Sequence, residues 1–187
     1  MIQISTAART NINHNEMREA GKLVTDLGFI YAYATDGSGG DPGGLTLISH
    51  NDCLGNDYLS QGNGIYLDAG LDGGCSNFRI QDNRIDSITR TAIRINSPST
   101  DNLIRKNYIG ADCRYCIDSL NVTGLNFANS EFKNNVVLAT QRYGPNLIES
   151  DFTDPPPPGE GLFIGADATS FDDDEIDYGS TITVFQW

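Results

Sequence analysis

One short pattern recurs five times in the chain, and each copy centres on an asparagine. An apolar residue lies three positions before the asparagine, and a second apolar residue lies two positions after it. The asparagines of the five copies are Asn15, Asn51, Asn83, Asn107 and Asn135, which lie 36, 32, 24 and 28 residues apart. Units that keep their core positions while the joints between them vary in length are typical of a solenoid.

The residues of each unit favour short strands over helices. Apolar and β-branched residues alternate with polar ones, and the units end in Asn, Asp, Ser or Gly. This is the pattern of strands between turns. The best stretch for an amphipathic helix, residues 15–27, is short and is interrupted by Gly21. The sequence therefore predicts an all-β solenoid and excludes helical repeats.

An asparagine that recurs once per unit has a physical explanation in a solenoid. Stacked coils repeat the same turn position about every 4.8 Å, the spacing of neighbouring strands. Asparagine tolerates left-handed backbone angles at such a turn, and its amide can donate to one neighbour while it accepts from another. We therefore expect the five asparagines to form a hydrogen-bonded ladder inside the stacked turns, with the flanking apolar residues pointing inward.

Four segments carry a family resemblance: DLGFIY (26–31), GIYLD (64–68), SNFRI (76–80) and NSPSTDNLI (96–104). They resemble the repeats of bacterial right-handed parallel β-helix proteins of the pectate-lyase-like superfamily, which act on polysaccharides. The resemblance spans roughly residues 4–140. It implies a right-handed parallel β-helix of about five rungs over residues 1–150. We expect residues 151–187 to form a Pro-rich linker and then an acidic C-terminal β cap or tail.

A looser motif after each asparagine predicts an outward-facing surface. It places Ile30, Ile65, Ile93 and Ile117 at the centres of short strands. If these isoleucines point inward, their neighbours point outward, because successive side chains of a strand face opposite sides. One outward row then contains Tyr31, Tyr66, Arg94 and Asp118. The next outward row contains Tyr33, Asp68, Asn96 and Leu120.

The family resemblance implies that a polysaccharide lies along this face. Tyrosine rings would stack on sugars, Arg94 would neutralise a uronate or stabilise developing negative charge, and Asp68 or Asp118 would act as a base or metal ligand. The candidate catalytic residues are Asp68, Arg94 and Asp118. The candidate ligand-binding residues are Tyr31, Tyr33, Tyr66, Asp68, Arg94 and Asn96. The alternative is that these side chains form solvated cross-strand pairs without a ligand.

The cysteines and one sequon favour a secreted, extracellular protein. The four cysteines are even in number, and Asn121-Val122-Thr123 is an acceptor sequence for N-glycosylation at Asn121. Cys113 and Cys116 either form a small local disulfide or stay as two free thiols. A zinc site would need a second cysteine pair at similar spacing, which the sequence lacks. Cys53 falls at an inward position, so we expect it in the core.

No cofactor is expected, although residues 36–41 and 68–72 contain oxygen ligands of the kind that Ca²⁺ takes. Their spacing does not match an EF-hand, and segments rich in Gly and Asp are usually plain turns. His14 and His50 align one unit apart, each directly before a ladder asparagine. This pair suggests a metal or a general base, but stacked turn residues are the simpler explanation. We assign no metal site.

The net charge of the chain limits the classes of partner that it can bind. Asp and Glu total 25 against 12 Lys and Arg, so the net charge is −13, which argues against nucleic acid and anionic membranes. No apolar run approaches the ~18 residues of a membrane span, which argues against membrane insertion.

Two functions stay open, and the sequence does not decide whether the chain is an enzyme. The first is a secreted module that binds or processes polysaccharide. The second is a structural or adhesive subunit of an extracellular fibre, tailspike or filament, with neighbouring β-helix subunits as its partners.

Overall fold

The computed structural model of this chain describes residues 1–5, 8–19, 27–56, 62–69, 74–96, 98–119, 129–139 and 141–143. These residues form strands β1 to β16, with no helix among them. No membrane-spanning helix is present in this part of the chain. The linker and cap expected at residues 151–187 lie outside the described residues, and so do Leu120 and the sequon residue Asn121.

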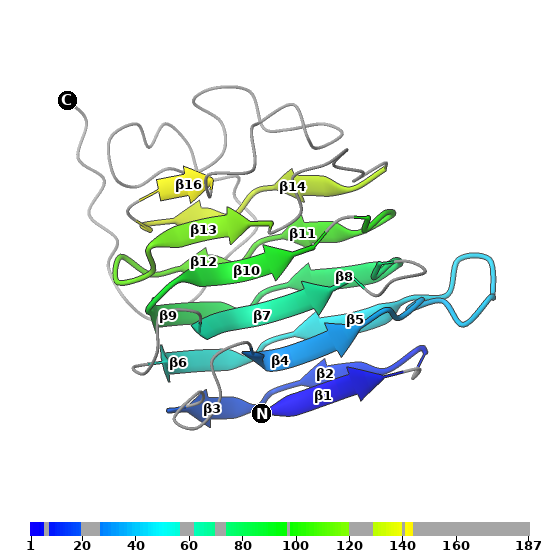
Figure 1. The fold of residues 1–187 in the computed structure, drawn as a ribbon, viewed down its shortest axis with the longest axis horizontal. Helices are drawn as coiled ribbons and strands as arrows, with labels where there is room; N and C mark the ends of the chain where they lie inside the picture. Colours follow the sequence, from blue (N-terminus) through cyan, green and yellow to red (C-terminus); the bar gives the residue numbers. More distant parts are fainter. Residues whose placement is uncertain are drawn as a thin grey trace.

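The strands form three sheets, which we name A, B and C (Figure 1). Sheet A contains, in spatial order, β1 (Ile2–Ser5), β4 (Leu27–Tyr33), β7 (Gly62–Asp68), β10 (Thr91–Ile95), β13 (Tyr115–Asp118) and β16 (Gln141–Tyr143). Sheet B contains β2 (Asn11–Asn13), β5 (Thr46–Ser49), β8 (Phe78–Gln81), β11 (Leu103–Arg105) and β14 (Glu131–Lys133). Sheet C contains β3 (Glu16–Arg18), β6 (Asp52–Asn56), β9 (Arg84–Ile88), β12 (Tyr108–Ile109) and β15 (Val136–Val137).

Consecutive strands of the chain belong to different sheets, and each strand pairs with the strand that comes three places later. The pairs between β1 and β4, between β4 and β7, and between β7 and β10 are all parallel, as are those of sheets B and C. Figure 1 shows the resulting coils stacked from β1, β2 and β3 in blue to β16 in yellow. The predicted all-β parallel solenoid is therefore confirmed.

The register of each sheet stacks apolar side chains on the inside of the coils. Sheet A aligns Ile30, Ile65, Ile93 and Ile117. Sheet B aligns Ile12, Ile48, Ile80, Ile104 and Phe132. Sheet C aligns Met17, Cys53, Ile85, Ile109 and Val137. All of these residues are buried except Met17, which is partly buried against them, so the inward positions expected from the sequence form the core.

The five asparagines form the expected ladder on the turns between sheets B and C. The backbone N–H of Asn15 donates to Asn51 Oδ1 at 3.1 Å, and Asn15 Nδ2 donates to the same oxygen at 2.9 Å. Equivalent pairs of bonds join Asn51 to Asn83, Asn83 to Asn107 and Asn107 to Asn135. The last four asparagines are buried, so the ladder satisfies main-chain donors where water cannot reach them.

The turn angles differ from our expectation in one respect. The left-handed conformation falls on the residue before each ladder asparagine, not on the asparagine itself. These residues are His14, His50, Asp82, Lys106 and Asn134, with φ between 52° and 55°. The preceding residue reverses the chain, and the asparagine side chain then points along the stack to the next turn. We call these five residues the turn column.

Candidate functional site

The first outward row expected on sheet A is present. Strand pairing places Tyr31 beside Tyr66, Tyr66 beside Arg94 and Arg94 beside Asp118. The rings of Tyr31 and Tyr66 meet edge to face, with centroids 5.2 Å apart. The guanidinium of Arg94 lies over the Tyr66 ring, 5.0 Å from its centroid, in a cation–π contact. Side-chain contacts therefore join the first three residues of the row, and Asp118 follows Arg94 in the register of the fourth strand.

The second row is tied to the first by hydrogen bonds. Tyr33 lies beside Asp68 on neighbouring strands, and the backbone N–H of Asn96 donates to Leu67 on the strand of Asp68. Asn96 Nδ2 donates to Asp68 Oδ1 at 2.7 Å, and the Tyr31 hydroxyl donates to Asp68 Oδ2 at 2.7 Å. Each oxygen of Asp68 thus accepts a hydrogen bond that fixes the orientation of the carboxylate.

Much of this surface is less accessible than we expected. Arg94 and Asp118 have no exposed area, Tyr66 has 1%, and Asn96 has 8%. These side chains do face the outside of sheet A, but a ligand cannot reach them in this conformation. Tyr33 is 42% exposed. The accessible part of the two rows is accordingly their N-terminal end, which lies on strands β4 and β7.

The N-terminal end of the rows has a simple composition. Tyr31 and Asp68 are half-buried, and Tyr33 is exposed. On β1, Gln3 pairs with Tyr31 and Ser5 pairs with Tyr33, and both of these polar residues are exposed. We call these five residues the tyrosine platform. It offers two aromatic rings and one carboxylate, flanked by small or uncharged polar groups.

Asp118 has the most perturbed environment of the candidate catalytic residues. Burial raises the pKa of its carboxyl, and the Ser119 backbone N–H and the positive charges of Arg90 and Arg94 oppose this rise. The Arg90 guanidinium lies 3.6 Å from Asp118 Oδ2. A raised carboxyl pKa suits a general acid or base, but that chemistry also requires contact with a substrate. The buried carboxyl and Arg90 instead have the geometry of an internal ion pair.

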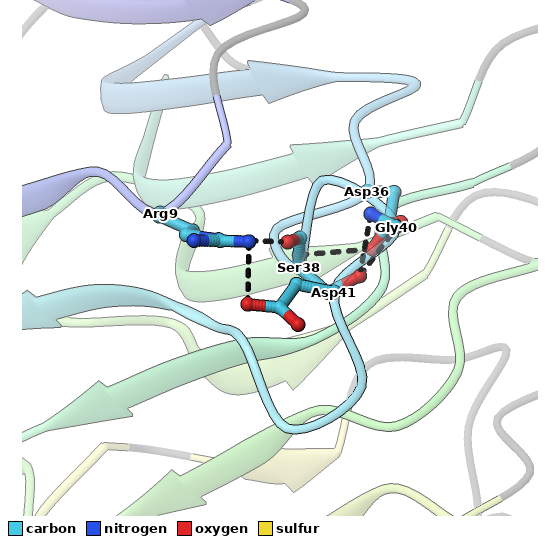
Figure 2. Close-up of polar contacts among 5 residues, drawn as sticks. All are labelled: Arg9, Asp36, Ser38, Gly40 and Asp41. Atoms are coloured by element: carbon cyan, nitrogen blue, oxygen red, sulfur yellow. Dashed lines mark hydrogen bonds and ion pairs between the residues drawn. The ribbon is translucent and has the colours of Figure 1, made fainter.

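The turn at residues 36–41 uses its carboxylates internally (Figure 2). Asp36 accepts hydrogen bonds from the Ser38 N–H at 2.9 Å, the Ser38 hydroxyl at 2.8 Å and the Gly40 N–H at 3.2 Å. Asp41 forms an ion pair with Arg9, whose Nε donates to the Ser38 carbonyl. Among the described residues no three His, Cys, Asp or Glu side chains cluster. The arrangement is that of a hydrogen-bonded turn, because its oxygens are already engaged by donors.

Asp36 gives this turn a defined dependence on pH. Burial of the carboxyl acts to raise its pKa, but hydrogen bonds from Ser38, Asn77 and Gly40 together lower the pKa from 3.8 to about 2. A pKa that is lower in the folded state adds stability above pH 4, and this stability is lost as the pH falls toward 2. We expect Asp36→Asn to be less stable than the wild type at pH 5, by less than about 1 kcal/mol because the exposed carboxylate is screened.

The difference between the wild type and Asp36→Asn should shrink between pH 4 and pH 2. Urea denaturation of both proteins across this range measures the difference directly. A difference that stays constant down to pH 2 would show that the carboxylate charge does not contribute.

The cysteines are four buried free thiols. Of the two alternatives for Cys113 and Cys116, the local disulfide is therefore wrong, and the thiols pack into the core as small apolar side chains. Cys113 Sγ also approaches the Ile85 carbonyl oxygen at 3.7 Å. Burial raises the pKa of Cys113 to about 12 and that of Cys75 to about 11. These thiols are consequently poor nucleophiles and poor metal ligands in the folded protein.

His14 and His50 stack on adjacent turns, as their alignment in the sequence predicts. Their ring centroids lie 5.0 Å apart, and the ring planes differ by 3°. Both residues are exposed. They belong to the turn column between sheets B and C, so they are not part of the outer face of sheet A.

Sequence reasoning missed Arg90 as a partner of Asp118. This residue directly precedes β10, where neither the asparagine pattern nor the strand motif draws attention to it. Its role follows only from the pairing that brings the Tyr115 N–H to the Arg90 carbonyl and aligns β13 with β10. What these observations establish is a parallel β-solenoid with a tyrosine platform on one face. No family model, curated protein or solved structure matches this chain.

Proposed function

We propose that the protein is an extracellular module that binds a polysaccharide on its tyrosine platform. Tyr33 supplies the exposed ring, and Tyr31 supplies a second ring on the same strand. Aromatic rings offer large apolar faces at low entropic cost, and sugar rings present matching C–H faces. The carboxylate of Asp68 accepts hydrogen bonds, which suits the hydroxyl groups of a sugar.

The observation that carries this proposal is the rigidity of the platform. The Tyr31 hydroxyl is held by Asp68, and Asp68 is held in turn by Asn96. The strands below these side chains are fixed by parallel pairing on both sides. A surface that is already ordered loses little conformational entropy when a ligand binds. The resemblance to pectate-lyase-like β-helices, in which the polysaccharide lies along this sheet, supports the same face.

We propose a neutral polysaccharide and binding without catalysis. The net charge of −13 and the carboxylate of Asp68 oppose a chain of uronates. Arg94, the residue that would neutralise a uronate, has no exposed area. Asp118 also has no exposed area, so it cannot contact a ligand on the platform.

The test is binding to a panel of neutral and uronate-containing polysaccharides. We expect a neutral polymer to bind and Tyr33→Ala to weaken the binding roughly tenfold, the equivalent of about 1.4 kcal/mol. Tyr108→Ala is the matched control, because Tyr108 is a half-buried tyrosine on sheet C, away from the platform. Circular dichroism and thermal melts would verify that both variants fold.

A structural or adhesive β-helix subunit is the second candidate. The contact of Arg94 with Tyr66 and the ion pair of Arg90 with Asp118 favour it, because buried outward-facing side chains strengthen a scaffold and leave little open groove. A wild-type protein that binds no polysaccharide of the panel would contradict the binding proposal and favour this candidate. Equal binding by the wild type and Tyr33→Ala would remove the platform as the site.

A further inference from the structure

The only two histidines of the chain lie side by side on the surface. His14 and His50 occupy equivalent positions of adjacent turns, with φ of 54° and 53°. The ladder bonds from Asn15 to Asn51, at 2.9 and 3.1 Å, hold the two turns in register directly behind them. The backbone therefore fixes the separation of the imidazoles, while the exposed side chains keep freedom to rotate.

We propose that His14 and His50 form a chelating site for a divalent transition-metal cation, with Cu²⁺, Ni²⁺ and Zn²⁺ as its ligand class. A metal bonds each imidazole nitrogen at about 2.1 Å, so two nitrogens on one metal lie at most about 4 Å apart. The ring centroids are 5.0 Å apart. Both imidazoles are exposed, so we expect rotation of the two side chains to close this difference while the backbone stays in place.

Within the described residues, stacking on each other orients these rings and no hydrogen bond does. Neither imidazole is a hydrogen-bond donor or acceptor there, so a metal would not have to displace an existing hydrogen-bond partner. The next member of the turn column is Asp82, whose carboxylate accepts a hydrogen bond from Gln81 Nε2 at 2.8 Å. No cluster of three potential ligands is present in this part of the chain. The site is thus a two-imidazole chelate with its other coordination positions open to water.

The donor set determines which metals bind. Neutral imidazole suits copper, nickel and zinc, whereas Ca²⁺ and Mg²⁺ prefer oxygen ligands. The buried thiols do not compete in the folded protein, because Cys53, Cys75, Cys113 and Cys116 have no exposed area. The second imidazole is already within reach when the first one binds, which raises its effective concentration and makes the pair tighter than either histidine alone.

Two variants test the site without disturbing the turn. His14→Asn and His50→Asn each remove one imidazole and introduce a residue that tolerates a left-handed backbone. The chain itself carries asparagine at the equivalent position of another turn, Asn134, with φ of 52°. Lys106→Asn is the matched control, because it makes the same type of change in the same column and leaves both histidines in place.

We expect the wild-type chain to bind one Ni²⁺ by titration calorimetry, and Cu²⁺ to show two imidazole nitrogens by electron paramagnetic resonance. Each histidine variant should lose affinity by roughly tenfold or more and show at most one imidazole nitrogen. Lys106→Asn should behave as the wild type. Only one imidazole nitrogen on Cu²⁺ in the wild type, or Ni²⁺ affinities of both histidine variants within threefold of the wild type, would overturn the proposal. The site lies on a different face from the tyrosine platform, so it stands or falls independently of polysaccharide binding.

Discussion

Replacing Asn83 with alanine is expected to lower the free energy of unfolding by about 3 kcal/mol. Asn83 Oδ1 accepts from both the backbone N–H and Nδ2 of Asn51, at 3.0 and 2.9 Å. Its Nδ2 donates to the Ile48 carbonyl and to Asn107 Oδ1, each at 2.9 Å. Removal of the amide breaks all four bonds: Asn51 Nδ2 keeps its bonds to the Ile12 and Ser49 carbonyls and Asn107 Oδ1 keeps the Asn83 backbone N–H, but the Asn51 backbone N–H loses its acceptor. A buried polar group without a partner costs about 1–3 kcal/mol.

The matched control for this change is Asn15→Ala, at the end of the same ladder. Asn15 is only half-buried, and its Oδ1 accepts no hydrogen bond from the residues that the structure describes. Water can replace the partners that its removal exposes, so we expect a loss of about 1 kcal/mol or less. Urea denaturation measures both variants. Equal losses at the two positions would show that stability does not depend on burial of the ladder.

The asparagine ladder could be predicted because one residue type performs the same task on every turn. Its position is fixed by the apolar residues on either side, so one asparagine and two apolar positions are enough to find each copy. The inward isoleucines of sheet A follow in the same way, because Ile30, Ile65 and Ile93 recur at corresponding places. Because the turns repeat, residues that stack in the structure recur as a pattern in the sequence.

A second set of stacked polar side chains could not be predicted. Thr46 Oγ1, Asn102 Oδ1 and Ser130 Oγ accept backbone N–H groups from the preceding coil, donated by Thr10, Phe78 and Asn102. The three acceptors are fully or almost fully buried. Because a threonine, an asparagine and a serine share the task, no single letter recurs. The same physical requirement is met here without leaving a sequence pattern.

The accessibility of the outer face could not be predicted either. Alternation along a strand gives the side of the sheet on which a residue lies, and it placed Tyr66, Arg94 and Asp118 correctly in one row. It carries no information about which outward residues solvent reaches. The burial of these three side chains opposes ligand binding at their positions. It therefore distinguishes polysaccharide binding from a structural role better than the residue types do.

The buried charges of this row lead to the second large expected effect. Arg94→Met is expected to destabilise the protein by about 3 kcal/mol, because it removes one of the two positive charges that offset burial of the Asp118 carboxylate and also the cation–π contact with Tyr66. Asp118 would keep only the Arg90 guanidinium, 3.6 Å from its Oδ2. Burial already raises the pKa of Asp118, which shows that its charge is penalised even with both arginines present.

Adding Asp118→Leu to Arg94→Met should restore part of the lost stability, because the carboxylate that Arg94 offset is no longer buried, although Arg90 then loses its ion pair with Asp118. Urea denaturation of the wild type, both single variants and the double variant gives the coupling free energy, which we expect to exceed about 1 kcal/mol. Arg79→Met on sheet B is the control, because Arg79 is half-buried and pairs with no carboxylate among the described residues. Simple additivity of the two losses would mean that Arg94 and Asp118 act separately. Strong coupling would instead assign the pair to the stability of sheet A, which leaves the tyrosine platform as the part of this face available to a ligand.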